Sequence, residues 1–178
     1  NWAEPPKEQA AWMDSRPKIV AFPTRRQADG NATIMEDSEE YLREAIALAY
    51  ANAEKGGRPF GAVIVRDGRI IAKAVNEISE TGDPTSHAEL NAIRLASKSL
   101  GADLSGCAVF ASGHPCPMCM AAMRLTGINA VTYAYSNEDG APHGLSTAGI
   151  YDELALPFSQ QSMELRHMPV RLVGRPVL

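Results

Sequence analysis

The chain of 178 residues contains few cysteines: only Cys107, Cys116 and Cys119. Small secreted domains that depend on disulfides carry cysteine more densely and at paired spacings. Cys116 and Cys119 lie three positions apart, which leaves Cys107 unmatched in the sequence. This usage excludes a disulfide framework and is typical of a reducing compartment, so we expect a cytoplasmic protein.

Long apolar runs and a basic excess are also lacking. No apolar stretch approaches the roughly 20 residues that a membrane-spanning helix needs, and no signal-peptide pattern precedes the domain. The 17 Lys and Arg residues are outnumbered by 21 Asp and Glu, which gives a net charge of −4 at pH 7. Nucleic-acid-binding domains normally show a basic excess. We therefore expect no membrane association, and the charge argues against a nucleic-acid partner.

The remaining composition is that of one globular domain. Hydrophobic residues make up 45% and charged residues 21% of the chain, and the length suffices for a sizeable core. Residues 1–36 carry several prolines and no sustained periodicity. We interpret residues 1–36 as an N-terminal extension and residues 37–178 as the folded domain.

Periodicity and turn residues predict the order of the secondary structure. Ser38 is a good helix cap, and apolar residues then recur at helical spacing until Gly56. Asp67-Gly68 joins two β-rich runs as a hairpin. Further predicted strands are 107–112, 130–135 and 165–173, and further predicted helices are 87–100, 116–127 and 150–154. Alternation of strands and helices after a hairpin predicts an α/β domain of three layers, α/β/α, around a mixed five-stranded sheet.

Two short motifs carry the chemistry. They are HAE at residues 87–89 and PCPMC at residues 115–119. One imidazole and two thiolates are a known ligand set for catalytic zinc, which leaves a fourth position to water. Cys116 and Cys119 share one face if their segment is helical, and Pro115 favours a helix start there. We therefore predict one zinc ion per chain, bound by His87, Cys116 and Cys119.

Glu89 lies two residues beyond His87 and is poorly placed to bind the same ion. It is free to move protons to and from the water at the metal. A structural alternative is a capping box, in which Ser86 caps a helix and Glu89 reaches back to the cap. This alternative accounts for Glu89 without any chemistry.

The two cysteines also have alternatives. They are consistent with small buried apolar residues or with a redox pair. A further alternative adds His114 to the three ligands, which closes a four-ligand structural zinc site with no open position.

The two motifs in this order resemble the H-x-E and P-C-x-x-C signature of the zinc-dependent cytidine-deaminase-like superfamily. The chain is most similar to the branch of guanine deaminases and tRNA-adenosine deaminases. The resemblance extends from about residue 38 to about 134, through PFGAVIV (59–65), Asn76, DPTSHAE (83–89) and PCPMC (115–119). It implies the cytidine-deaminase-like fold and a hydrolase that releases ammonia from an amino-purine or related heterocycle.

The resemblance also implies roles for individual residues. Glu89 is expected to be the catalytic proton carrier, and Asn76, Phe60 and His114 are expected to contact the substrate. Asn76 has an alternative as a turn residue that bonds its own backbone. His114 departs from the superfamily, which commonly has glutamate, serine or threonine there. Relatives of this kind are dimeric, and the methionine-rich segment after Cys119 looks too apolar for one covered face. We therefore expect a homodimer.

Substrate size is less directly encoded. Residues 137–158 carry four carboxylates and no lysine or arginine. An acidic stretch near the site would repel phosphates and accept hydrogen bonds from a guanine-like base. We therefore predict a free base or nucleoside rather than RNA. The alternatives are a tRNA adenosine, a pyrimidine or pterin, and a noncatalytic zinc-stabilised domain that binds a partner.

Overall fold

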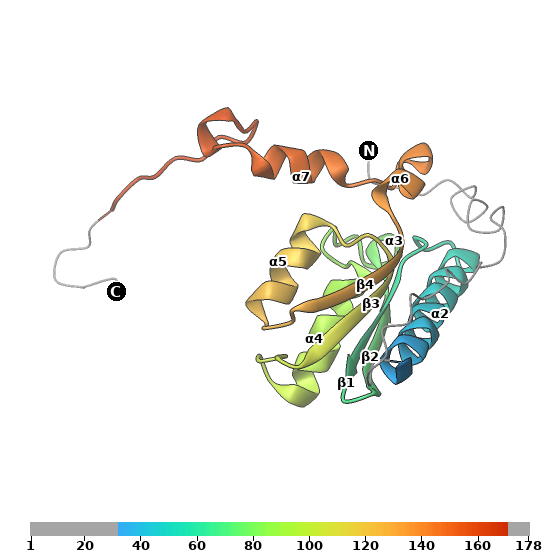
Figure 1. Cartoon of the computed structure of the whole chain (residues 1–178). Helices are drawn as coiled ribbons and strands as arrows, with labels where there is room; N and C mark the ends of the chain where they lie inside the picture. The colour runs from blue at the N-terminus through green and yellow to red at the C-terminus, as the bar shows by residue number, and fades with distance from the viewer. Residues whose placement is uncertain (1–31, 171–178) are drawn as a thin grey trace.

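The computed structural model describes residues 32–170, which form a four-stranded sheet with helices on both faces (Figure 1). The sheet order is β2-β1-β3-β4, with bounds Arg69–Val75, Gly61–Arg66, Cys107–Gly113 and Ala130–Tyr135. β1 is antiparallel to both β2 and β3, whereas β3 and β4 are parallel. The prediction of a mixed sheet is confirmed.

The hairpin between β1 and β2 turns at Asp67 and Gly68, as predicted. Both residues have positive φ, 50° and 70° respectively. Two successive positive φ values define the type I′ turn, whose twist matches that of paired strands. β1 lies between β2 and β3 in the sheet, and all its residues except Arg66 are buried.

Helix α2 (Ala32–Glu54) covers one face of the sheet (Figure 1). Its Ala45 packs in one cluster with Val63, Val65 and Phe110 of the strands. A Cβ atom at Gly61 would lie 2.3 Å from the carbonyl oxygen of Ala45, so the close approach of helix and strand requires glycine. The helix begins before the predicted cap Ser38, because the residues upstream of it tolerate helical conformation.

Helices α4 (Ala88–Leu100) and α5 (Pro117–Leu125) cover the opposite face (Figure 1). The three-layer prediction is therefore confirmed. The larger core cluster lies here and includes Ile64, Leu104, Val109 and Met123. Met118 and Met120 pack against the same cluster. The methionines of α5 thus belong to the core, and they no longer support the expectation of a dimer.

The fifth strand predicted for residues 165–173 is not formed over 165–170. These residues carry no regular structure and are exposed. Residues 171–173 lie outside the described part of the chain. Pro169 lacks the N–H that a ladder needs, and in the part of the chain that the structure describes β4 has no neighbour on its outer side.

After β4 the chain forms short helices: α6 (Asn137–Gly140), η2 (Ala141–His143), α7 (Ala148–Ala155) and η3 (Phe158–Gln160). The remaining short helix, α3 (Ile78–Thr81), follows β2. From α7 onward the chain leads away from the sheet (Figure 1). We call residues 148–170 the C-terminal arm. Its exposed apolar side chains are Ile150, Leu154, Leu156, Phe158, Met163, Leu165, Met168 and Val170. Among the described helices, none has the length and apolar character needed to cross a membrane.

Candidate metal centre and substrate cavity

The predicted metal ligands lie at the starts of two adjacent helices. His87 is the N-cap residue of α4 and Cys116 that of α5, and Cys119 follows in the first turn of α5. The carbonyl oxygens of His87 and Cys116 accept the first helical hydrogen bonds, from Asn91 and Met120. Pro117 occupies the first turn of α5, where a missing N–H costs nothing. Packing of α4 and α5 on one sheet face brings the two motifs together.

The three side chains fit a tetrahedral metal. The two sulfur atoms are 3.5 Å apart, and His87 Nδ1 lies 3.5 Å from Cys116 Sγ and 3.6 Å from Cys119 Sγ. Zinc–sulfur bonds of about 2.3 Å and zinc–nitrogen bonds of about 2.0 Å at tetrahedral angles separate two sulfurs by about 3.8 Å, and a sulfur from a nitrogen by about 3.5 Å. In the described part of the chain, these three form the metal-binding group.

The electrostatics of this group favour a cation. The hydrogen bond from Cys119 lowers the pKa of the Cys116 thiol to about 4, and the bond with His87 acts in the same direction. Burial lowers the pKa of His87, but the hydrogen bond and charge of Cys116 outweigh it, so the net shift is upward. The hydrogen bond with Cys116, together with burial, raises the pKa of the Cys119 thiol. A thiolate and an imidazole within contact distance form a soft donor set suited to zinc.

Glu89 lies in the first turn of α4 beside this group, with Oε2 3.5 Å from Cys119 Sγ. Burial raises the pKa of its carboxyl group, which is 7% exposed. The capping-box alternative is wrong: the cap residue is His87, and no side chain caps this helix. The Ser86 N–H donates instead to the carbonyl oxygen of Asp83, so Glu89 is not needed there.

His114 does not belong to the metal group, so the four-ligand alternative is not supported. Its backbone N–H donates to the carbonyl oxygen of Tyr135 in β4. Its ring stacks between those of Tyr133 and Tyr151, at centroid distances of 4.6 and 5.5 Å. The side-chain amide of Asn137 donates to His114 Nδ1 at 2.8 Å. With Nδ1 accepting, a neutral His114 carries its proton on Nε2.

Asn76 combines the two roles considered for it. Its Oδ1 accepts a hydrogen bond from the Ile78 N–H, as a turn asparagine does, and the residue also lines the cavity. Asn52 of α2 holds this wall, because its amide group donates to the carbonyl oxygens of both Arg58 and Asn76, at 2.7 and 2.8 Å. Phe60 lies between them in sequence and lines the same cavity.

The metal group opens into a cavity of about 710 Å³. This volume lies within the range of small-molecule sites. His87, Glu89 and Cys116 lie on its wall together with Phe60, Asn76 and His114. The structure thus brings every predicted site residue to this cavity except Cys119, which is fully buried behind it.

The carboxylates of residues 137–158 are placed differently from the prediction. The cavity wall from this segment consists of Gly144, Leu145, Ser146, Thr147 and Ile150. Asp139 is used in a capping box with Ser136, and Glu153 accepts a hydrogen bond from the Ser162 N–H. These carboxylates therefore do not face a base in the cavity, and they no longer support the preference for a free base.

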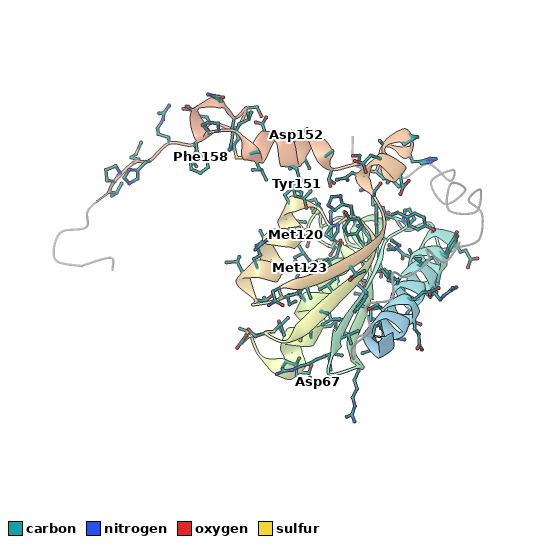
Figure 2. All side chains as sticks on the ribbon, in the orientation of Figure 1. Asp67, Met120, Met123, Tyr151, Asp152 and Phe158 are labelled. Atoms are coloured by element: carbon teal, nitrogen blue, oxygen red, sulfur yellow. The ribbon has the colours of Figure 1, made fainter. Side chains whose placement is uncertain are left out.

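Sequence reasoning missed four residues that shape this site: Arg58, Asn52, Asn137 and Tyr151. Asn137 links His114 to Thr147, whose N–H donates to Asn137 Oδ1 at 2.9 Å. The Tyr151 hydroxyl, from α7, donates a hydrogen bond of 2.6 Å to the Pro115 carbonyl oxygen. In Figure 2, Tyr151 lies on the side of α7 that faces α5. Asn52, Asn137 and Tyr151 act through contacts with other segments, which periodicity does not reveal. Arg58 had a local signal in the sequence, because it is a cation next to an apolar strand.

The fold and the HAE and PCPMC motifs identify the class of protein. The family model for the cytidine and deoxycytidylate deaminase zinc-binding region matches residues 35–135. The chain belongs to this family. It is accordingly a zinc-dependent deaminase, and the predicted fold is confirmed.

Individual relatives show which members of this family the chain is similar to. The chain is 42% identical over 127 residues to the guanine deaminase of Bacillus subtilis, a match that covers 70% of this chain and 81% of that protein. The X-ray structure of a Bacillus subtilis guanine deaminase superposes with a TM-score of 0.69 at 40% identity, covering 74% of this chain and 85% of the other. A tRNA-specific adenosine deaminase of Aquifex aeolicus is 39% identical over 121 residues, or 66% of this chain and 78% of the relative.

Proposed function

We propose that the protein deaminates a guanine-like amino-purine, as free base or nucleoside, by hydrolysis. The observation that carries this proposal is the buried Glu89 carboxylate beside the His87, Cys116 and Cys119 donors, on the wall of one cavity. The similarity to guanine deaminase supports the choice of heterocycle.

The proposed chemistry divides between the metal and Glu89. When bound by His87, Cys116 and Cys119, zinc would act as a Lewis acid and lower the pKa of the attacking water to about 7. Glu89 takes a proton from the attacking water and delivers it to the ring nitrogen next to the amino-bearing carbon. Glu89 then carries the second proton to the departing amine. One water is consumed, ammonia leaves, and a carbonyl remains on the ring.

A raised carboxyl pKa suits this role. A group that must both accept and donate a proton works best when its pKa approaches the working pH. Burial moves the Glu89 pKa in that direction. Asn76 would contribute a donor from its side-chain N–H₂, because its Oδ1 is already used by the Ile78 N–H. The Phe60 ring would cover a face of the base.

The second candidate is a tRNA adenosine, favoured by the similarity to the Aquifex aeolicus enzyme. An ammonia-release screen separates the candidates. It compares guanine, guanosine, adenine, cytosine, cytidine, pterin and a tRNA anticodon stem-loop, with zinc-loaded Glu89→Gln protein as the blank. We expect release from guanine or guanosine. Release from the stem-loop alone would replace the proposal, and release from none would favour the partner-binding alternative.

We also propose that the protein is a cytoplasmic homodimer. The cysteines Cys107, Cys116 and Cys119 are free in the structure, which suits a reducing compartment. The exposed apolar side chains of the C-terminal arm support self-association, because a chain surface of this kind is normally covered by a partner.

A further inference from the structure

His114 borders the substrate cavity with one edge of its imidazole ring. The rings of Tyr133 and Tyr151 stack on its two faces, at interplanar angles of 7° and 21°. The side-chain amide of Asn137 lies 2.8 Å from Nδ1. These three neighbours are not part of the cavity wall, whereas His114 is. The ring edge that contains Nε2 is therefore the part of the side chain that reaches the cavity.

The hydrogen bonds behind the ring decide what Nε2 offers. The backbone N–H of Thr147 can only donate, and it donates to Asn137 Oδ1 at 2.9 Å. The Asn137 amide is thereby oriented with its oxygen toward Thr147 and its N–H₂ group toward His114. Nδ1 of His114 must accept, so the ring proton lies on Nε2. No residue in the described part of the chain bonds to Nε2, which leaves this N–H donor available to a ligand.

This donor lies where a base would be bound. His114 stands between β3 and α5, two residues before the metal ligand Cys116. The residue before it, Gly113, packs on Phe60, because a Cβ atom at Gly113 would lie 2.9 Å from Phe60 Cε1. A base that stacks on Phe60 is therefore held in the part of the cavity that His114 borders.

Donors on a cavity wall favour a base with acceptors. Asn76, which is 2% exposed, also offers its N–H₂ group, because its Oδ1 is used by the Ile78 N–H. A ring carbonyl would give His114 an oxygen with two lone pairs, whereas an amino group in its place would meet it with a second donor. Two opposed donors leave each other without a partner away from water, so a site built for a hydrogen bond rejects such an analogue.

We propose that His114 determines specificity: it donates its Nε2–H to a ring carbonyl of the base and selects against heterocycles with a second amino group in that place. Asn137 is a positioning residue, because it fixes the ring proton on Nε2. This inference rests on the proposed function, which places the amino-bearing carbon beside Glu89. Guanine, pterin and cytosine carry a ring carbonyl, and adenine does not.

Guanine and 2,6-diaminopurine test the inference. They share the purine ring and the 2-amino group and differ at carbon 6, which carries a carbonyl in guanine and an amino group in diaminopurine. Because their intrinsic reactivities differ, the readout is the change in the ratio of their kcat/KM values. His114→Phe keeps a ring between the two tyrosines and removes the donor. We expect this variant to lower the ratio of guanine to diaminopurine about 10- to 100-fold, mainly through KM for guanine. An unchanged ratio overturns the inference.

Three further variants separate the donor from its structural surroundings. His114→Gln places an amide N–H₂ group near the position of Nε2 and should keep more of the ratio than His114→Phe does. Asn137→Leu allows the ring proton on either nitrogen and should lower the ratio about 3- to 10-fold. Ser136→Ala is the matched control, because it removes the cap of α6 next to Asn137 and should lower stability with the ratio unchanged. Equal falls in the ratio for Ser136→Ala and Asn137→Leu would contradict the positioning role.

Binding separates this inference from the proposed function. Calorimetry with zinc-loaded Glu89→Gln protein measures the affinity for both purines without turnover. Tighter binding of guanine that is lost on adding His114→Phe supports the role of His114 even if no compound releases ammonia, in which case the proposed function fails. If His114→Phe does not fold, His114→Gln takes its place and should reduce the difference in affinity. Equal affinities in the Glu89→Gln protein, or binding of neither purine, overturn the inference.

Discussion

The Tyr151 hydroxyl donates a 2.6 Å hydrogen bond to the carbonyl oxygen of Pro115, the residue before the Cys116 ligand. This bond joins the C-terminal arm to the segment between β3 and α5, just before the metal ligand Cys116. Tyr151→Phe keeps the ring that stacks on His114 and removes only the bond. A net loss of about 0.5–1.5 kcal/mol predicts a fall in kcat/KM of roughly 2- to 10-fold with zinc retained. Tyr41→Phe, which loses a similar bond to Gly68 at the distant hairpin, should leave kcat/KM unchanged. Equal effects of the two variants would contradict the prediction.

Zinc content is predicted to depend on two of the three cysteines. Metal analysis should find one zinc per chain, lost in Cys116→Ala and in Cys119→Ala. Cys107→Ala is the matched control, because Cys107 is buried at the start of β3 outside the metal group. Removing the metal with a chelator should lower the thermal midpoint, because bound zinc holds the starts of α4 and α5 together. Full zinc retention in Cys116→Ala would disprove the ligand assignment.

Glu89→Gln is predicted to abolish turnover while keeping the metal. Loss of a general acid and base costs about 10²- to 10⁴-fold in rate. The buried amide avoids the cost of burying a charge, so the thermal midpoint should not fall. Glu80→Gln, at an exposed position of α3, is the control and should retain full activity. Comparable ammonia release by Glu89→Gln and the unmodified protein would exclude Glu89 as the proton carrier.

Asn52→Ala is predicted to weaken substrate binding from outside the cavity. It removes the donors to the Arg58 and Asn76 carbonyl oxygens and leaves both partly buried. We expect a stability loss of about 1–3 kcal/mol and a rise in KM, with kcat less affected. Chemical denaturation and steady-state kinetics measure the two effects. A stability loss with unchanged KM would show that Asn52 supports the fold alone.

Self-association is predicted to depend on the C-terminal arm. Light scattering at micromolar concentration should give the mass of a dimer. Phe158→Asp places a charge on a side chain that is 70% exposed on the arm and should shift the protein toward monomer. Asp152→Asn, on the outer side of α7 in Figure 2, is the control. A monomer mass for the unmodified protein would contradict the prediction.

Prediction from sequence succeeded where the signal was local. The Asp67-Gly68 turn, the helices α4 and α5, and the two motifs that carry the metal ligands each follow from residues within a few positions of one another. Features that depend on distant contacts were not accessible. The stacking of His114 between Tyr133 and Tyr151 arises only when β4 pairs with β3 and α7 places Tyr151 beside Pro115. The carboxylates of Asp139 and Glu153 were likewise misplaced, because their partners are set by local turns that a charge count does not register.

The two N-cap positions occupied by metal ligands imply a trade between activity and stability. His87 and Cys116 stand where serine, asparagine or aspartate would normally satisfy the first free N–H groups, and neither caps its helix through its side chain. Each unsatisfied cap costs about 0.5–2 kcal/mol relative to such a residue. Without the metal, capping residues at both positions would therefore give a more stable protein than histidine and cysteine do. Bound zinc offsets this cost, so the stability of the two helix starts depends on the same ion that supplies the chemistry.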